Sequence, residues 1–186
     1  MGYFELFSKI VGYVESLNNP YAIRFEEHLY QNYLSRKPND AVVRYINKCS
    51  MRTAFMIMAT SWGKYQILGI NLYNRLDYDK PIGHYLCDED EQDISFAEFL
   101  KKIIKAQDIE EYSKKIIDEL LIFERVKKSY LSHELNKALL EHKDKIPFTI
   151  NFIRTYNGAI YPSSNFQNYF LRMLHALNKF RKEFSI

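Results

Sequence analysis

The sequence predicts a mainly α-helical fold, and three observations support this prediction. Apolar residues recur at steps of three and four through most of the chain, which is the spacing of one buried helix face. Hydrophobic residues make up 47% of the 186 residues and charged residues 26%, so the chain can bury a core without disulfides or metal. No internal repeat or low-complexity linker interrupts it. We therefore expect a single domain over residues 1–186.

The first third of the chain is predicted to hold three or four helices. The apolar stripe of residues 4–15 indicates an amphipathic helix, which the segment before Pro20 ends. A second helix is expected to begin after Pro20 and to end before Arg36, with Ile23, Phe25, Leu29, Tyr30 and Tyr33 on its buried face. Residues 41–60 indicate one long helix or two short ones, and the second half, nearly free of charge, is expected to be buried.

Two segments in the middle of the chain break the helical spacing. Residues 61–71 contain Gly63 and Gly69 among aromatic and polar side chains, and we interpret them as a structured loop with a small hairpin near residues 62–74. Residues 73–93 carry Pro81, Gly83 and an acidic run. We expect an irregular, solvated surface segment there.

The second half of the chain returns to helical spacing. Helices are expected from Asp93 or Ser95 to about residue 105, from 109 to about 130, and over a shorter stretch near 132–140. Pro147 is predicted to begin the next helix, since the missing N–H does no harm in the first turn. That helix ends before Gly158, and the last helix runs from about 164 to 182.

Composition excludes several classes of protein. The 26 basic and 23 acidic residues leave a net charge of +3, which is not the charge pattern of a nucleic-acid-binding protein. Cys49 and Cys87 are far apart and lack ligand spacing, so we expect free thiols and neither a metal nor a cofactor. No apolar run is long enough for stable membrane insertion. The amino terminus shows no secretory signal, so synthesis in a cytoplasm is expected.

Glu15 is the candidate acid. Breaking a glycosidic bond requires a carboxylic acid that stays protonated near neutral pH in an apolar setting. Glu15 ends the first apolar helix, and both apolar neighbours and the negative end of a helix dipole favour the protonated form of a carboxyl. Local features alone leave an ordinary solvated glutamate as the alternative.

Three short stretches, in their order along the chain, resemble motifs of known enzymes. A Glu-Ser pair at Glu15 and Ser16 closes the first helix, a Gly-x-x-Gln loop lies at Gly63 to Gln66, and a Tyr-Asn pair closes a later helix at residues 156–157. This order resembles goose-type lysozymes and lytic transglycosylases, in which these motifs meet around one cleft.

The chain more closely resembles the N-acetylmuramidase family of phage endolysins. That family has a Phe-Glu-x-His segment, matched by residues 25–28, and a closing Tyr-Asn-Gly block, matched by residues 156–158. Its Ser-Trp/Tyr-Gly-x-x-Gln-Ile-x-Gly-x-Asn block is matched by Ser61, Trp62, Gly63, Gln66, Ile67, Gly69 and Asn71. The family places glycines directly after its Glu-Ser pair, whereas this chain has Leu17-Asn18-Asn19-Pro20.

The resemblance implies a lysozyme-like helical domain, with the hairpin beside a cleft, that cleaves the bond between N-acetylmuramic acid and N-acetylglucosamine. Glu15 is then the general acid, and Glu26 is the candidate second carboxylate, acting as base for a water or pairing structurally with Arg24 or Arg52. The expected substrate-binding residues are Ser61, Trp62, Gln66, Tyr156 and Asn157. Among them, the two amides supply neutral hydrogen bonds, and the two large aromatic residues either line the sugar subsite or pack in the core.

The partner implied by the resemblance is bacterial peptidoglycan, reached by a monomer after release through a holin-like pore or by a delivery machine. A lytic transglycosylase uses the same acid and stays an alternative. A non-catalytic peptidoglycan-binding or phage structural module is a further alternative, favoured by the altered segment after Ser16. The basic flank of the last helix leaves a nucleic-acid-binding or regulatory protein as the weakest alternative.

Overall fold

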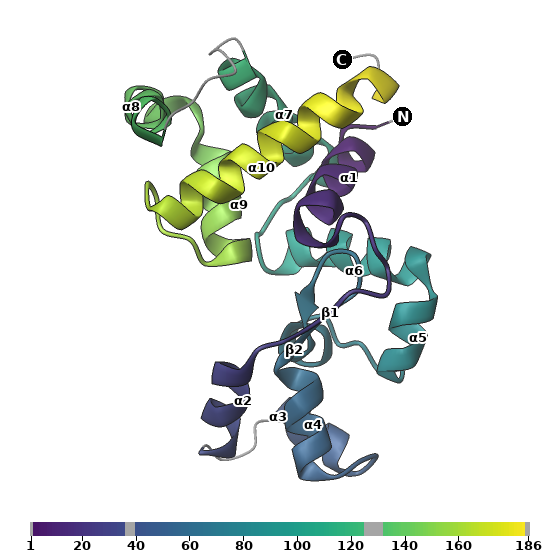
Figure 1. The fold of residues 1–186 in the computed structure, drawn as a ribbon. Coiled ribbons are helices and arrows are strands. Elements are labelled where there is room, and N and C mark those ends of the chain that lie inside the picture. The colour runs from purple at the N-terminus through teal and green to yellow at the C-terminus, as the bar shows by residue number, and fades with distance from the viewer. Residues whose placement is uncertain (1, 36–39, 125–131, 185–186) are drawn as a thin grey trace. The chain divides into compact units, whose positions relative to one another are not determined.

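The computed structural model describes residues 2–35, 40–124 and 132–184. It confirms the mainly α-helical fold with a small sheet (Figure 1). The chain forms two compact units: a helical unit of residues 1–14 and 103–186, and a sheet unit of residues 15–102. This division does not test whether the two units fold as one domain, so the single domain expected over residues 1–186 stays a prediction. Within the described ranges, no helix is both long enough and apolar enough to cross a membrane.

The sheet unit contains short helices around three short strands. Its elements are β1 (Ile23–Phe25), α2 (Glu27–Leu34), α3 (Asp40–Ile46), α4 (Met51–Met58), β2 (Thr60–Trp62), β3 (Ile67–Leu68), the π-helix η1 (Asn71–Arg75), α5 (Ile82–Cys87) and α6 (Glu89–Lys102). The two short helices α3 and α4 confirm one of the two arrangements expected for residues 41–60. The end of α4 lies against β3, because a Cβ added at Gly69 would collide with the backbone carbonyl of Ile57.

The strands form an antiparallel sheet in the order β1-β2-β3. Ser61 in the middle strand pairs with Arg24 of β1 and Leu68 of β3. The β2–β3 pair is the hairpin that the sequence predicted. The helix predicted to begin after Pro20 is wrong for residues 21–26, because Ile23 and Phe25 are both exposed and give no buried helical face. The helix begins only at Glu27.

The predicted irregular segment over residues 73–93 is also wrong, because α5 and the start of α6 occupy much of it. The acidic residues 89–91 form the first turn of α6, where the helix dipole favours negative charge. Asp88 caps this turn by accepting the backbone N–H of Glu91 at 3.1 Å. Most side chains of this segment are exposed or half-buried, but Tyr85 and Gln92 are fully buried and anchor its helices to the core.

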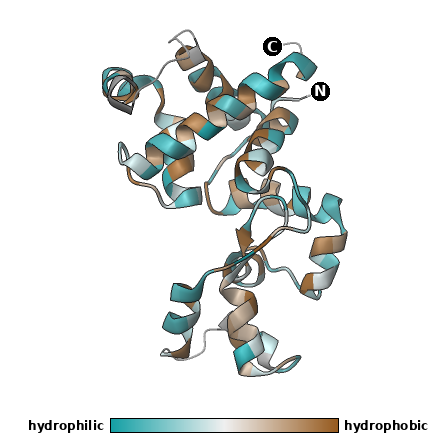
Figure 2. Ribbon diagram, viewed as in Figure 1, coloured by the Kyte–Doolittle hydropathy of each residue, from teal (hydrophilic) through white to brown (hydrophobic). Residues whose placement is uncertain are grey.

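The helical unit packs long amphipathic helices against one another. Its elements are α1 (Tyr3–Ser16, up to Val14), α7 (Ile109–Glu124), α8 (Ser132–Glu141), the 3-10 helix η2 (Lys143–Lys145), α9 (Pro147–Asn157), α10 (Ser164–Phe180) and the 3-10 helix η3 (Arg181–Phe184). The hydrophobic residues of α10 alternate with polar ones along the ribbon (Figure 2), and its apolar stripe is buried. Gly158 ends α9 with φ 77°, as its position after Asn157 predicted.

Glu119 of α7 caps the start of α9 from outside that helix. Its carboxylate accepts the backbone N–H of Phe148 at 3.0 Å and both the N–H and the hydroxyl of Thr149 at 2.7 Å. These N–H groups have no partner within α9, and the dipole there favours a negative charge. Burial raises the pKa of Glu119 above its ordinary value of 4.5, and the hydrogen bonds from Thr149 and Phe148 oppose that shift.

Stability of the protein is expected to fall as the pH rises through the titration of Glu119. Because its folded-state pKa lies above the unfolded value of 4.5, the folded state binds the proton more tightly, and this contribution is complete below 4.5 and lost above the folded pKa. Glu119→Gln should remove that slope and lower the free energy of unfolding at pH 7 by about 1–3 kcal/mol, through lost hydrogen bonds to a charged group. Urea unfolding between pH 4 and 8 measures both effects.

Asp118→Asn is the matched control, since Asp118 is the exposed neighbour on α7 and pairs only with Lys114 at 3.2 Å among the described residues. It should change the free energy of unfolding by less than about 0.5 kcal/mol. An unchanged pH slope in Glu119→Gln would contradict the assignment of the slope to Glu119.

Candidate functional site

Glu15 lies in the last turn of α1 and is half-buried, as is Ser16 after it. The Ser16 hydroxyl donates to the backbone carbonyl of Lys64 at 2.8 Å and accepts the backbone N–H of Asn19 at 3.1 Å. The first bond fixes the end of α1 to the loop between β2 and β3, and the second closes the turn that follows α1. The Glu-Ser pair and the Gly-x-x-Gln loop, which are 48 residues apart at Ser16 and Lys64, are therefore in direct contact.

The turn after Ser16 adopts a backbone conformation that glycine favours, although the turn contains no glycine. Leu17 and Asn18 have φ angles of 59° and 62°, in the left-handed region that side chains rarely adopt. Glycines stand at this place in the family that the sequence resembles. In this chain, Leu17 and Asn18 adopt the left-handed conformation beside Glu15 without glycine.

Leu17→Gly is expected to keep or raise stability. Glycine relieves about 1–2 kcal/mol of left-handed strain and costs about 0.5–1 kcal/mol of chain entropy, while the exposed Leu17 side chain loses little burial. Leu17→Val should instead destabilise the protein, because a β-branched side chain is least tolerated at positive φ. Urea unfolding of the two variants tests this order. A larger loss of stability in Leu17→Gly than in Leu17→Val would contradict it.

Gln66 shapes the loop that carries it. Its side-chain amide Nε2 donates to the carbonyls of Gly63 at 2.9 Å and Ala22 at 3.0 Å, and its own backbone lies at φ 50°. Both side-chain N–H groups are thus directed to the protein. The side-chain carbonyl oxygen, Oε1, is therefore the atom of Gln66 that we predict to contact a sugar.

Gln92 joins three segments around this loop, and sequence reasoning missed it. Its Nε2 donates to the carbonyls of Pro20 at 3.1 Å and Tyr85 at 2.9 Å, and its Oε1 accepts the backbone N–H of Lys64 at 2.7 Å. The side chain is fully buried. Gly63 permits this approach, because it has φ 73° and a Cβ there would lie 2.5 Å from Gln92 Oε1. The signal for Gln92 was its place four residues before the buried Phe96.

Lys64 adds an electrostatic connection from the same loop to α6. Its ammonium lies 2.9 Å from a carboxylate oxygen of Asp93 and 3.7 Å from one of Glu89, with only 12% of its side chain exposed. The hydroxyl of Tyr65 also donates to Asp93, and the Tyr65 ring stacks on Phe96 at 4.4 Å. The loop after β2 is therefore held on α6 by both charge and packing.

Trp62 and Ser61 lie in the middle strand next to this loop. The indole Nε1 of Trp62 donates to the Ile57 carbonyl at 3.0 Å, and its ring is half-buried, so part of it is exposed. Ser61 is 1% exposed. The role of both in sugar binding stays a prediction, and the exposed part of the indole is the more accessible of the two.

Glu26 is held in an ion pair. The Arg24 Nε donates to Glu26 Oε1 at 2.7 Å, and 22% of the Glu26 side chain is exposed. Glu26 immediately precedes α2, and its backbone N–H donates to the Ala59 carbonyl at 2.8 Å. These contacts are those of the structural pairing that was expected as the alternative to a catalytic base.

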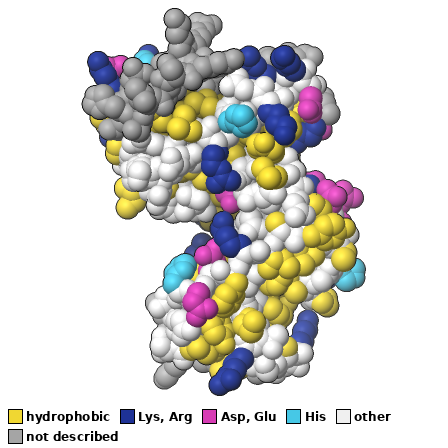
Figure 3. Space-filling model, viewed as in Figure 1, with side chains coloured by type: hydrophobic (Ala, Val, Ile, Leu, Met, Phe, Trp, Pro, Cys, Tyr) yellow, Lys and Arg dark blue, Asp and Glu magenta, His cyan; other side chains and the backbone are white. Residues whose placement is uncertain are grey.

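Exposed apolar side chains follow Glu15 along the chain. Leu17, Tyr21, Ile23 and Phe25 are exposed by 71%, 64%, 57% and 42%. Hydrophobic side chains are gathered on the face of the sheet unit that Figure 3 shows. Exposed apolar groups concentrated in this way are typical of binding surfaces.

Tyr156 and Asn157 end α9 and belong to the helical unit. The Tyr156 ring stacks on Phe152 with centroids 5.0 Å apart, and Asn157 is exposed. Among the predicted residues of the sheet unit, the structure joins the Glu15-Ser16 pair to the loop that contains Gln66, and it pairs the strand before Glu26 with the strand that contains Ser61 and Trp62. Convergence of Tyr156 and Asn157 with them stays a prediction.

The side chains of the candidate site are carboxyl, amide, hydroxyl and aromatic groups. Within residues 2–35, 40–124 and 132–184, no cluster of three or more His, Cys, Asp or Glu side chains is arranged to hold a metal ion. Cys49 and Cys87 are both free thiols. Acid–base chemistry by a carboxyl group is what this set of side chains can perform.

Comparison with known proteins gives one informative match. The chain is 39% identical over 97 residues to the endolysin of Enterobacteria phage PRD1, and the match covers 50% of this chain. This chain resembles a phage endolysin. The similarity spans 65% of the length of the phage protein. No family model matches the sequence, and no solved structure matches it.

Proposed function

We propose that the protein is a peptidoglycan hydrolase that cuts the glycosidic bond between N-acetylmuramic acid and N-acetylglucosamine, with Glu15 as general acid. The observation that carries this proposal is the contact of the Glu15-Ser16 pair with the Gly63-to-Gln66 loop through the Ser16–Lys64 hydrogen bond. The similarity to an endolysin, a name that denotes lysis of the cell wall, supports the same class of substrate.

Glu15 supplies the proton in this mechanism. The carboxyl donates its proton to the glycosidic oxygen while positive charge develops on the sugar ring in an oxocarbenium-like transition state. Its position at the carboxyl end of α1, half-buried, favours the neutral acid before reaction. After the bond breaks, the attacking water gives its proton to the Glu15 carboxylate if Glu26 has only a structural role.

The remaining predicted residues position the substrate. The exposed part of the Trp62 ring and Tyr156 contact sugar rings, and the Gln66 Oε1 and the Asn157 amide hydrogen-bond the acetamido groups without adding charge beside the acid. Glu26 either activates the water or, through its pair with Arg24, holds β1 in place. The pairing with Arg24 supports the second role.

Mass spectrometry of digested, purified peptidoglycan tests the reaction. Hydrolysis as proposed yields fragments with N-acetylmuramic acid at the reducing end. Anhydro products would identify a lytic transglycosylase, in which the sugar's own hydroxyl attacks in place of water. Reducing-end N-acetylglucosamine would show a different cleaved bond, and intact glycan with retained wall binding would show a non-catalytic module.

The proposed site of action is the bacterial cell wall, reached from the cytoplasm through a holin-like pore or a delivery machine, with the protein acting as a monomer. The similarity to a phage endolysin supports this setting. External addition of the purified protein to intact cells and to cells with permeabilised membranes tests it. Lysis confined to the permeabilised cells is expected.

A further inference from the structure

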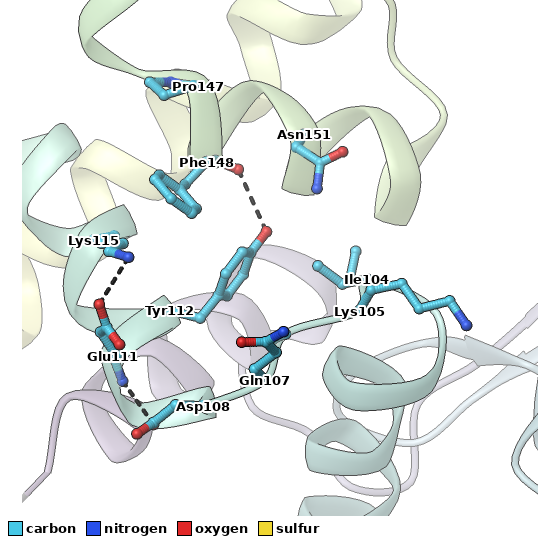
Figure 4. Close-up of a pocket in the computed structure, with 11 residues that line it drawn as sticks. Ile104, Lys105, Gln107, Asp108, Glu111, Tyr112, Lys115, Pro147, Phe148 and Asn151 are labelled. Atoms are coloured by element: carbon cyan, nitrogen blue, oxygen red, sulfur yellow. Dashed lines mark hydrogen bonds and ion pairs between the residues drawn. The ribbon is translucent and has the colours of Figure 1, made fainter.

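A pocket of about 350 Å³ lies in the helical unit between α7, α9 and the segment before α7 (Figure 4). Its volume falls in the lower part of the range of small-molecule sites in proteins. The pocket lies at the first turns of α9, where Asn151 faces it. Asn157 follows six residues later, about 9 Å along the helix axis. The pocket is therefore separate from the Tyr156-Asn157 end of α9.

The pocket combines an apolar wall with two side-chain amides. Ile104, Ala106 and the Tyr112 ring are nearly fully buried and form the wall. Asn151 of α9 and Gln107 of the segment before α7 extend from different sides of the pocket (Figure 4). Each amide can donate and accept a hydrogen bond.

The hydroxyl of Tyr112 lies between these amides and the start of α9. It donates to the Phe148 carbonyl at 3.5 Å, a long bond. Burial raises the pKa of Tyr112, and a hydrogen bond with the Asn151 side chain opposes this shift without reversing it, so the hydroxyl stays protonated over the physiological pH range. The pocket thus offers neutral donors and acceptors at its centre.

Of the lysines at the rim of the pocket, Lys105 has no ion-pair partner among the described residues and can interact with a ligand. Asp108 caps α7 by accepting the N–H groups of Glu110 at 2.8 Å and Glu111 at 3.0 Å, and the Glu111 carboxylate pairs with Lys115 at 2.8 Å. Lys105 is exposed and forms no ion pair within the described ranges of the chain. This distribution favours a ligand that is neutral or carries a single negative charge.

We propose that this pocket binds an acetamido sugar of the glycan substrate, as a site additional to the one that contains Glu15. The apolar wall receives the acetamide methyl group and the C–H groups of the ring, and the amides of Asn151 and Gln107 bind the acetamide N–H and C=O. Lys105 at the rim attracts a carboxylate where the sugar carries one. The proposal rests on the proposed function for the identity of the polymer, and it gives the helical unit its own contact with the glycan.

Nuclear magnetic resonance titration of the full chain with the trisaccharide of N-acetylglucosamine tests the site. The experiment uses the Glu15→Gln variant, so that the probe is not cleaved. Saturable shifts of the backbone amides of Gln107, Tyr112 and Asn151 are expected. Asn151→Leu, added to this variant, should weaken the binding that these signals report about tenfold, the effect of about one lost hydrogen bond. Asn168→Leu on the exposed side of α10 is the matched control and should leave it unchanged.

Two further probes distinguish the ligand chemistry. Cellotriose has the same ring linkage without acetamido groups, and equal shifts with cellotriose would overturn the acetamide assignment. Stronger shifts with an N-acetylated alanyl dipeptide would show a peptide site and also overturn it. Absence of shifts at the pocket with any probe, in a protein that still digests peptidoglycan, would refute the pocket alone. Shifts at the pocket in a protein whose wild type leaves peptidoglycan intact would refute the proposed function alone.

Discussion

Glu15→Gln is expected to lower the rate of glycan cleavage by about 10²- to 10⁴-fold, the usual contribution of a general acid. The amide has nearly the same shape as the carboxyl but cannot donate a proton of comparable acidity to the glycosidic oxygen. Release of reducing ends from purified peptidoglycan measures the rate, and far-UV circular dichroism checks the fold.

Two isosteric variants serve as controls for Glu15→Gln. Glu5→Gln makes the same change of charge at the start of the same helix and should retain wild-type activity. Glu26→Gln weakens the pair with Arg24 and should reduce activity less than Glu15→Gln if the pair is structural. Equal clearing of cell wall by Glu15→Gln and the wild type would remove Glu15 from the mechanism.

Gln92→Leu is expected to lower the free energy of unfolding by about 2–4 kcal/mol and to reduce cleavage as well. Leucine fills a similar volume but leaves three backbone groups without their partner: the Lys64 N–H and the carbonyls of Pro20 and Tyr85. Burial of groups without hydrogen bonds costs about 1–3 kcal/mol each before relaxation. The loop that Ser16 contacts then loses its connection to α6, so Glu15 loses its fixed position.

The measurements for Gln92→Leu separate positioning from general loss of stability. Hydrogen exchange of the Lys64 amide should accelerate, and kcat should fall more than KM rises at a temperature where the variant remains folded. Gln31→Leu, at an exposed glutamine of α2 in the same unit, should change neither quantity. Unchanged exchange at Lys64 together with normal kcat would refute the positioning role of Gln92.

The sequence predicted the helices best where their apolar stripes are long. The helix from Pro147 to Asn157 agrees with α9 at both ends, because Pro at the first turn and Gly158 after the last are strong local signals. Strand β1 was missed because three exposed residues produce no burial pattern, and its existence depends on pairing with β2. The acidic run before Gln92 was assigned to solvent, although acidic residues are also what a helix start favours.

One contact of the candidate site was predictable from the sequence, and other contacts were not. The contact between the Glu15-Ser16 pair and the Gly63 loop follows the resemblance, yet the donors of Gln66 are directed to Gly63 and Ala22. Gln92 was not predicted, because its three partners come from segments far apart in the chain. Such side-chain to backbone bonds depend on tertiary structure and leave only a weak trace in local spacing.

The turn after Ser16 bears on the non-catalytic alternative. The absence of glycines there was the feature that favoured a binding module. The left-handed conformation of Leu17 and Asn18 shows that this turn does not require glycine in this chain. The altered residues alone therefore do not favour the binding module over the enzyme.

The fluorescence of Trp62 reports on one of the two units. It is the single tryptophan of the chain and lies in β2 of the sheet unit. Its emission therefore follows denaturation of residues 15–102, whereas the far-ultraviolet ellipticity follows the helices of both units. Coincident denaturation curves from the two signals identify one cooperative body, and separated midpoints identify two.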